Sequence, residues 1–140
     1  MQDCIEEWKP VVGFVGIYEV SDQGRVRSFW TRGGRANRKI GARTRLLATR
    51  ISSNGYVTVR LSTVDGDRRE RWVHRLVLDA FAWYKPEKAQ AHHKDGCPTN
   101  NKLDNLEWVT PSINCQFREE VKKDERAGYN AEGQRDLCKA

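Results

Sequence analysis

The chain has 140 residues, with 25 lysine and arginine residues against 19 aspartate and glutamate residues and a formal net charge of +6. This length suits one domain, or a compact core with a small second lobe. No apolar run approaches the ~20 residues of a membrane span, and no basic-then-apolar leader opens the chain, so we expect neither a membrane protein nor a secreted precursor.

The N-terminal half has the alternating pattern of short strands. Residues 8–28 alternate between apolar and polar side chains around a Ser-Asp-Gln-Gly turn at 21–24, which predicts a β-hairpin. Further strands are predicted at 46–51 and 57–61, separated by an Asn-Gly turn, and residues 71–73 close a small meander.

After residue 72 the apolar period changes to that of a helix. Apolar residues from Val73 to Tyr84 fall on one helical face, and Pro86 ends the helix. Trp72, Trp83 and Trp108 are predicted to be core residues.

The last predicted elements are a strand and a second helix. Residues 106–109 form a short strand, and Thr110-Pro111 is a typical helix start. Ile113, Phe117 and Val121 are predicted to be the buried stripe of that helix, and the polar residues beyond Lys122 are predicted to form a frayed tail.

The four cysteines occur singly in the sequence. Because Cys4, Cys97, Cys115 and Cys138 include no C-x-x-C pair, a structural zinc ribbon is not supported. With no sign of export, we expect reduced thiols in a cytoplasmic compartment rather than a disulfide framework.

The positive charge is concentrated in one stretch. Residues 25–64 contain ten basic residues and no acidic one, whereas residues 1–24 contain one basic residue and five acidic ones. Flexible, cation-rich backbone is typical of a segment that lies along a polyanion, and the alternative is a solvated loop. The absence of acidic residues favours nucleic acid as the partner. The predicted DNA-binding residues are Arg25, Arg27, Arg32, Arg35, Arg38, Lys39, Arg43, Arg45, Arg50 and Arg60.

A group of polar residues between His92 and Asn114 is the candidate site. His92 and His93 end a predicted strand, and adjacent strand residues point to opposite faces, so the two imidazoles cannot do the same job. Asn105 enters the next strand, and Asn114 lies in the first turn of the helix after it. A strand–loop–strand–helix unit of this size would fold His92 and Asn114 towards the same cleft.

These residues carry a resemblance to a known family. The chain reads VHRL at 73–76, AHHKDG at 91–96 and NNKLDNLEWVT at 100–110, followed by Asn114, and this pattern resembles the HNH endonuclease module. It is similar in particular to the phage intron-encoded and free-standing HNH homing endonucleases. Upstream, residues 8–28 resemble the modular DNA-binding motif that often precedes that nuclease.

The resemblance implies a ββα-metal active site with a role for each matching residue. His93 matches the general base that takes a proton from the attacking water, and His92 matches the preceding metal-ligand position. Asn114 matches the second protein ligand, on the helix. Asn105 matches the central residue of the motif, which fixes the loop and helps orient the base.

The implied cofactor is one divalent metal ion, Mg²⁺ or Mn²⁺, with Zn²⁺ or Ni²⁺ as ions that could bind non-productively. A neutral imidazole with a pKa of about 6.5 suits the removal of a proton from water. A divalent cation can stabilise the charge on the phosphate and on the leaving 3′ oxygen. The expected products carry 5′-phosphate and 3′-hydroxyl ends.

The fold class expected from these observations is α+β, with a small N-terminal antiparallel β lobe followed by a ββα-metal (HNH) nuclease module. We expect three segments: a β-rich, arginine-rich DNA-binding lobe at 1–64, the nuclease module with its leading helix at 65–122, and a polar tail at 123–140. The expected partner is double-stranded DNA, with the protein a monomer or a homodimer. The expected location is the cytoplasm, that of a bacterial host if the chain is phage-encoded.

The expected function is metal-dependent hydrolysis of a DNA phosphodiester bond, as a nick or a double-strand cut, by a phage homing endonuclease. The alternative is a DNA-binding regulatory or inhibitory protein with a vestigial HNH fold, and a toxin-type DNase is a third, weaker reading. Three other polar residues of the quoted stretches have structural interpretations. Asn100 and Asn101 are expected to serve loop geometry, because asparagine tolerates left-handed backbone, and His74 is expected to be structural.

Overall fold

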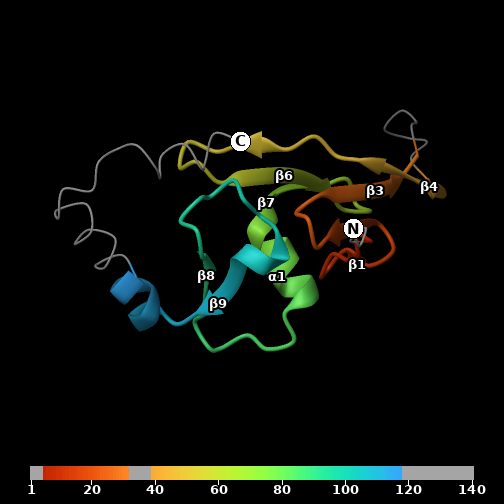
Figure 1. Ribbon diagram of the computed structural model, residues 1–140. Coiled ribbons are helices and arrows are strands. Elements are labelled where there is room, and N and C mark those ends of the chain that lie inside the picture. The colour runs from red at the N-terminus through yellow and green to blue at the C-terminus, as the bar shows by residue number, and fades with distance from the viewer. Residues whose placement is uncertain (1–4, 32–38, 118–140) are drawn as a thin grey trace.

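The computed structural model describes residues 5–31 and 39–117. Within these ranges the strands form a four-stranded, a three-stranded and a two-stranded sheet, and every strand pair is antiparallel (Figure 1). A β-rich N-terminal half followed by a helix, a strand pair and a further helical segment confirms the predicted α+β class. The predicted DNA contacts Arg32, Arg35 and Arg38 and the predicted tail at 123–140 lie outside the described residues.

The four-stranded sheet contains the predicted hairpin. Its strands are β1 (Trp8–Pro10), β2 (Tyr18–Ser21), β3 (Val26–Trp30) and β4 (Ile40–Leu46), in that spatial order. The hairpin of β2 and β3 is confirmed, because these strands pair on either side of the predicted turn.

The second sheet corrects one predicted strand. It contains β5 (Arg50–Ile51), β6 (Val57–Ser62) and β7 (Arg68–Trp72). The single strand predicted at 46–51 is wrong, since Leu46 ends a strand paired with β3 whereas β5 pairs with β6. A run of suitable residues shows that a segment can be extended, but the partner strand is decided by packing at long range.

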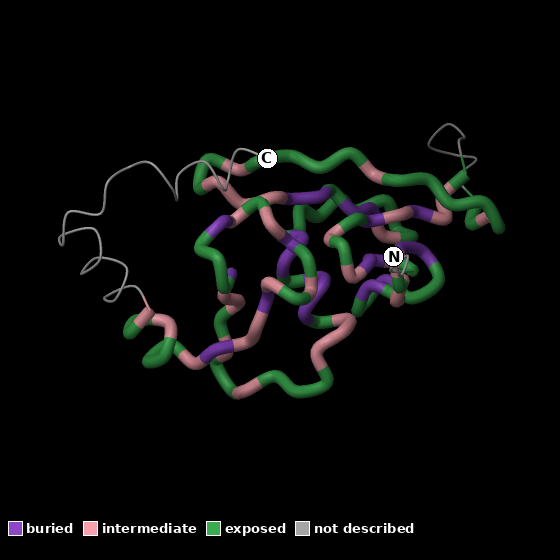
Figure 2. Tube along the Cα trace, in the orientation of Figure 1, coloured by how far each residue is buried: buried purple, intermediate pink, exposed green. Residues whose placement is uncertain are grey.

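We expected the arginine-rich stretch to be flexible, but part of it forms the regular strand β4. Its side chains are almost all exposed, and Figure 2 shows the segment from β4 through β5 as a mostly exposed run along one side of the molecule. Strands β6 and β7 pair across residue 64, so one sheet spans the predicted boundary between the lobe and the nuclease module. The boundary itself stays a prediction.

Helix α1 (Val73–Phe81) lies at the centre of the fold and contacts strands of all three sheets (Figure 1). The core includes Val73 and Val77 from the helix, Val20 and Leu61 from the two larger sheets, and Leu106 from the third. One core thus joins the N-terminal lobe to the candidate site.

The helix ends earlier than predicted. Ala82 has extended backbone, and Tyr84, which was expected on the apolar face, is exposed. The prediction of three core tryptophans is wrong for two of them, because Trp83 is 99% exposed and Trp72 is 41% exposed. Trp108 packs against the core as predicted.

The C-terminal part has the predicted ββα order. Strands β8 (Gln90–His93) and β9 (Leu106–Val109) pair, the 3-10 turn η1 (Leu103–Asn105) precedes β9, and residues 111–117 are helical. The Asn114 N–H donates to the Thr110 carbonyl at 3.0 Å, as expected for a helix that starts there. Ile113 is 42% exposed, so its predicted burial is wrong. Val121 lies outside the described residues.

No helix among the described residues is long and apolar enough to cross a membrane. The expectation of reduced thiols is wrong at Cys97, which is disulfide-bonded. Cys115 is a free and exposed thiol.

Candidate active site

The predicted site residues His92, His93 and Asn114 line one pocket of about 210 Å³. The histidines end strand β8, and Asn114 comes from the helical segment that follows β9. Strand β9 pairs back along β8, with His93 opposite Leu106 and Gln90 opposite Val109, so the chain leaves β9 beside the start of β8. The antiparallel pair thus brings a residue 21 positions after His93 to the same pocket.

His93 is buried and held through one ring nitrogen. Its side chain is 7% exposed, and its Nε2 lies 3.0 Å from the Asn101 Oδ1. An amide oxygen can only accept a hydrogen bond, so Nε2 carries the proton and the neutral ring has its lone pair on Nδ1. Burial lowers the pKa of His93, while the bond to Asn101 and the charge of Asp95 oppose that shift. A neutral ring with one free basic nitrogen is what a general base requires.

Asn105 does not line the pocket; its side chain clamps the loop between the two strands. Its Oδ1 accepts from the Asp95 N–H at 3.0 Å, and its Nδ2 donates to the Asp95 Oδ1 and to the Asn100 carbonyl, each at 2.9 Å. The ends of the loop are also joined directly, because the Lys94 N–H donates to the Asn105 carbonyl at 2.8 Å. These contacts suit the predicted loop-fixing role of Asn105, which stays a prediction.

Asp95 is the centre of this network. Its carboxylate accepts from the Cys97 N–H at 2.8 Å, from Asn100 at 2.8 Å and from Asn105 at 2.9 Å. Burial works against the charged form, but the three hydrogen bonds outweigh it and lower the pKa of Asp95. The charge of Asp95 therefore helps to rigidify the turn that follows His93.

His92 and Asn114, the two predicted metal ligands, line the same pocket. The Asn114 Nδ2 donates to the Gln90 Oε1 at 2.6 Å, which leaves Oδ1, the amide atom that hard cations prefer, for another ligand. The His92 ring stacks on Phe117, with ring centroids 4.6 Å apart and planes 13° apart, so its orientation is supported from one side.

Among residues 5–31 and 39–117, no group of three or more His, Cys, Asp or Glu side chains could hold a metal ion. A site made by His92 and Asn114 would thus supply two neutral ligands and leave the remaining positions to water and phosphate. Such an open coordination shell suits a catalytic ion better than a structural one.

A second pocket of about 260 Å³ adjoins the first and shares Tyr56, Ala91 and Asn114 with it. It is also lined by His74 and Arg75. The Arg75 guanidinium lies 4.7 Å from the centroid of the Trp72 ring, so the lining of this pocket includes a cation that packs on an aromatic ring.

The His74 ring packs against that of His93, the candidate base. Its ring centroid lies 5.0 Å from that of His93, and it stacks on Trp72 with an interplanar angle of 12°. The His74 side chain is buried, and among the described residues its Nδ1 has no hydrogen-bond partner. Burial, helped by the nearby His93 and Arg75, lowers the pKa of His74 to about 4. His74 is therefore a neutral packing partner at physiological pH, in line with the structural interpretation.

The predicted DNA-binding residues divide into two groups. Arg25 is ion-paired with Glu6 and Arg27 with Glu19, so both charges are already partnered within the protein. The unpaired basic set is exposed and forms no ion pair with a described residue. It comprises Lys39, Arg43, Arg45, Arg50 and Arg60.

Sequence reasoning assigned no role in the site to three residues that lie beside it. Asn101, interpreted as loop geometry, binds the candidate base, and its backbone is not left-handed. Tyr56 lines both pockets, and Arg75 lines the second. An apolar-polar pattern does not distinguish these residues from packing or solvated positions. For Asn101 the available signal was its place in the short loop that directly follows His93.

Comparisons with known proteins agree with this geometry. Residues 6–62 match the NUMOD4 motif, and residues 71–116 match the HNH endonuclease family. The DNA endonuclease I-HmuI of Bacillus phage SP01 is 36% identical over 110 residues, which cover 79% of this chain and 56% of that protein. An uncharacterized HNH endonuclease of Acanthamoeba polyphaga mimivirus is 34% identical over 115 residues, covering 79% of this chain and 25% of that protein.

A solved structure is also similar. It describes DNA binding and cleavage by the HNH homing endonuclease I-HmuI, with a TM-score of 0.67 and 30% sequence identity. The similarity covers 87% of this chain and 66% of the other. The chain therefore matches a little over half of I-HmuI and only a quarter of the mimivirus protein in length.

Proposed function

This chain belongs to the HNH endonuclease family, with a NUMOD4 motif before the nuclease module, and from that membership we propose that it is a metal-dependent DNA endonuclease of the phage homing type. The observation that carries the proposal is the shared pocket of His92, His93 and Asn114, with His93 held through Nε2. A vestigial fold would have no need for a buried, hydrogen-bonded imidazole beside two further ligand-type side chains.

In the proposed reaction, His93 is the general base. Its Nδ1 takes a proton from a water molecule, and the resulting hydroxide attacks the phosphorus of the scissile phosphodiester. The bond from phosphorus to the 3′ oxygen breaks, and the leaving oxygen takes a proton from solvent water, which yields 5′-phosphate and 3′-hydroxyl ends. The Nε2–H bond to Asn101 keeps the ring from turning while the proton moves.

His92 and Asn114 are the residues that would hold the divalent cation, Mg²⁺ or Mn²⁺. When bound, the cation supplies Lewis-acid stabilisation of charge on the phosphate and on the leaving oxygen. Asn114 Oδ1 is free for this role because its Nδ2 is already bonded to Gln90. Arg75 lies beside Asn114 in the second pocket, where its charge would favour the approach of a phosphate.

Double-stranded DNA is the proposed substrate, and the unpaired basic set supports this proposal. Exposed cations that form no ion pair within residues 5–31 and 39–117 can neutralise phosphates and release counterions on binding. Regular strand structure holds Arg43 and Arg45 in place, and strand residues spaced by two project from the same face. This set would track the duplex backbone while the pocket reaches the scissile phosphate.

The test is a plasmid-cleavage assay with Mg²⁺ or Mn²⁺, comparing the wild type with His93→Ala. We expect metal-dependent nicking or cutting by the wild type and a loss of about 10²- to 10⁴-fold in the variant. DNA binding, measured without added metal, should be the same for both proteins. Equal cleavage by the two proteins would remove His93 as the base. Binding without any metal-dependent cleavage by the wild type would favour the alternative, a DNA-binding regulatory protein.

A further inference from the structure

The acceptor that holds His93 is itself held by a distant part of the chain. Asn101 is 5% exposed, and its Oδ1 lies 3.0 Å from the His93 Nε2. Asn101 also packs against Gly24, in the turn between β2 and β3 of the N-terminal sheet. A Cβ built on Gly24 would lie 2.8 Å from both the Cβ and the main-chain oxygen of Asn101.

A backbone hydrogen bond adds a second contact between the turn and the loop. The Leu103 N–H donates to the Asp22 carbonyl at 2.7 Å, two residues from Asn101. The loop that carries the acceptor for His93 is thus joined to the hairpin turn by one close approach and one hydrogen bond. Only a residue without a Cβ permits the close approach, and Gly24 also has a left-handed φ of +80°.

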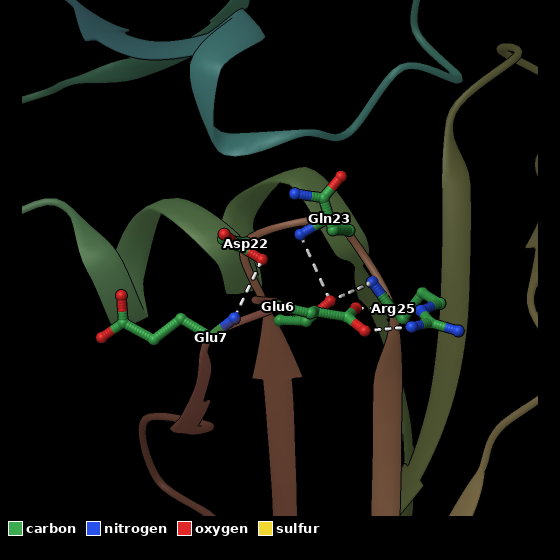
Figure 3. Close-up of polar contacts among 6 residues, drawn as sticks. Glu6, Glu7, Asp22, Gln23 and Arg25 are labelled. Atoms are coloured by element: carbon green, nitrogen blue, oxygen red, sulfur yellow. Dashed lines mark hydrogen bonds and ion pairs between the residues drawn. The ribbon is translucent and has the colours of Figure 1, made fainter. Parts of the chain in front are cut away.

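The turn itself is internally braced, as Figure 3 shows. The Ser21 Oγ accepts from the Gln23 and Arg25 N–H groups, at 3.3 and 3.0 Å. The segment before β1 adds two contacts, since the Glu7 N–H donates to the Asp22 Oδ1 at 3.2 Å and Glu6 forms an ion pair with Arg25 (Figure 3). A braced turn can transmit a displacement to its neighbour, whereas a loose one would absorb it.

We propose that the β2–β3 turn positions the catalytic base: Gly24 and Asp22 set the place of Asn101, and Asn101 sets the orientation and tautomer of His93. Asn101 and Gly24 are positioning residues, and the inference rests on the proposed role of His93. It gives the N-terminal lobe a part in the chemistry besides DNA binding. A shift of the hairpin relative to the nuclease module would change the rate of cleavage without a change in the charges that face DNA.

The first test replaces Asn101 by residues of similar size with and without an acceptor oxygen. Asn101→Asp keeps an acceptor for Nε2–H, whereas Asn101→Leu removes it. With both variants at about pH 8, above the ordinary histidine pKa of about 6.5, imidazole-nitrogen NMR reports the tautomer of His93. We expect the Nε2–H tautomer in the wild type and in Asn101→Asp, and a mixture of tautomers in Asn101→Leu.

Single-turnover cleavage at saturating protein is the second readout on the same variants. Asn101→Leu should slow cleavage by about 10- to 100-fold with unchanged DNA affinity, and Asn101→Asp should restore most of the rate. Equal tautomer populations and equal rates in the two variants would overturn the role of Asn101. Because the NMR readout needs no activity, a wild type that does not cleave would contradict the proposed function while the positioning claim is still decided.

The second test uses two glycines of the same lobe with the same backbone strain. Gly24→Ala and Gly16→Ala both place a Cβ on a left-handed residue, with φ of +80° and +79°, but nothing lies within 4 Å of the Cβ position at Gly16. Strain alone would affect the two variants equally. We expect only Gly24→Ala to shift the His93 imidazole signals and to slow single-turnover cleavage, by about 10-fold, with DNA affinity unchanged.

Identical behaviour of Gly24→Ala and Gly16→Ala in both readouts would overturn the coupling between the turn and the base. Circular dichroism and thermal unfolding check that each variant is folded. If Gly24→Ala does not fold, Leu103→Pro takes its place as the test. This variant removes the N–H that donates to the Asp22 carbonyl. A normal His93 signal and a normal rate in that variant would also count against the proposal.

Discussion

The loop between β8 and β9 and the strand β4 differ in whether their polar side chains have partners within the described part of the protein. In the loop, the Asp95 carboxylate and the Asn100, Asn101 and Asn105 amides bond to one another, to the backbone or to His93. On β4, Arg43 and Arg45 are exposed and form no ion pair with a described residue.

This difference reflects two physical requirements. A base must stay in one orientation, which demands that its neighbours be fully bonded and immobile. Binding to a polyanion demands charges that are still free, because an arginine already paired with a carboxylate releases fewer counterions. The comparison predicts that changes in the loop alter the rate of cleavage and changes on β4 alter DNA affinity.

After the loss of the proposed base His93, the largest effect should come from the proposed metal ligand on the helical segment. Asn114→Ala removes the free Oδ1, so we expect single-turnover cleavage to fall by about 10²-fold or more and the metal concentration for half-maximal rate to rise. Metal titrations of cleavage would measure both. Asn114→Asp, which keeps an oxygen, should retain metal-dependent activity, and Gln116→Ala on the same segment is the control. An unchanged metal requirement in Asn114→Ala would argue against its role as a ligand.

A smaller effect is expected from the clamp of the loop. Asn105→Ala removes two hydrogen bonds to Asp95 and one to the Asn100 carbonyl, with an expected loss of about 1–3 kcal/mol in the free energy of unfolding. Cleavage should also slow by about 10-fold or more, because the loop carries Asn101. Urea denaturation and single-turnover assays measure the two effects. A variant with normal stability and a normal rate would show that the loop needs no clamp.

The buried His74 predicts how stability depends on pH. Its pKa is about 4 in the folded protein against the ordinary value of 6.5, so between these values the unfolded chain binds a proton that the folded protein does not. Stability is therefore fully present above pH 6.5 and falls as the pH drops towards 4. From pH 7 to pH 5 we expect His74 to contribute a loss of about 2 kcal/mol.

Urea denaturation at several pH values, comparing the wild type with His74→Phe, isolates this contribution. Phenylalanine keeps a ring between Trp72 and Tyr56 but does not titrate. The lowered pKa of His93 acts in the same direction and remains in both proteins. The same pH dependence in the two proteins would mean that His74 is accessible to protons in the folded state.

The smallest effect should come from the exposed strand. The double variant Arg43→Ala/Arg45→Ala should weaken DNA binding several-fold at moderate salt and make the slope of log affinity against log salt shallower by about 2. The rate at saturating protein should not change. Binding titrations over a salt series measure this, with Thr44→Ala on the same strand as the uncharged control. A slope equal to that of the wild type would exclude β4 from the DNA interface.

Much of the local structure could be predicted from the sequence. The β2–β3 hairpin, the start of α1 at Val73 and the strand at 106–109 each depend on turn residues or on a periodicity within about ten positions. The choice of a strand's partner does not depend on such local signals. For this reason residues 46–51 were assigned to one strand instead of two. The exposure of Trp72 and Trp83 was also missed, because large apolar residues are usually buried and the neighbouring elements decide the exceptions.

The sequence by itself indicated the nuclease family, because two imidazoles and two carboxamides at these positions resemble the HNH motif. Tertiary structure alone decided which nitrogen of His93 is held, and by which residue. Asn101 reaches the ring across the loop, and Gly24 reaches Asn101 from the other half of the chain. Such contacts join residues far apart in sequence, and a buried polar group takes whichever partner the packed fold places beside it.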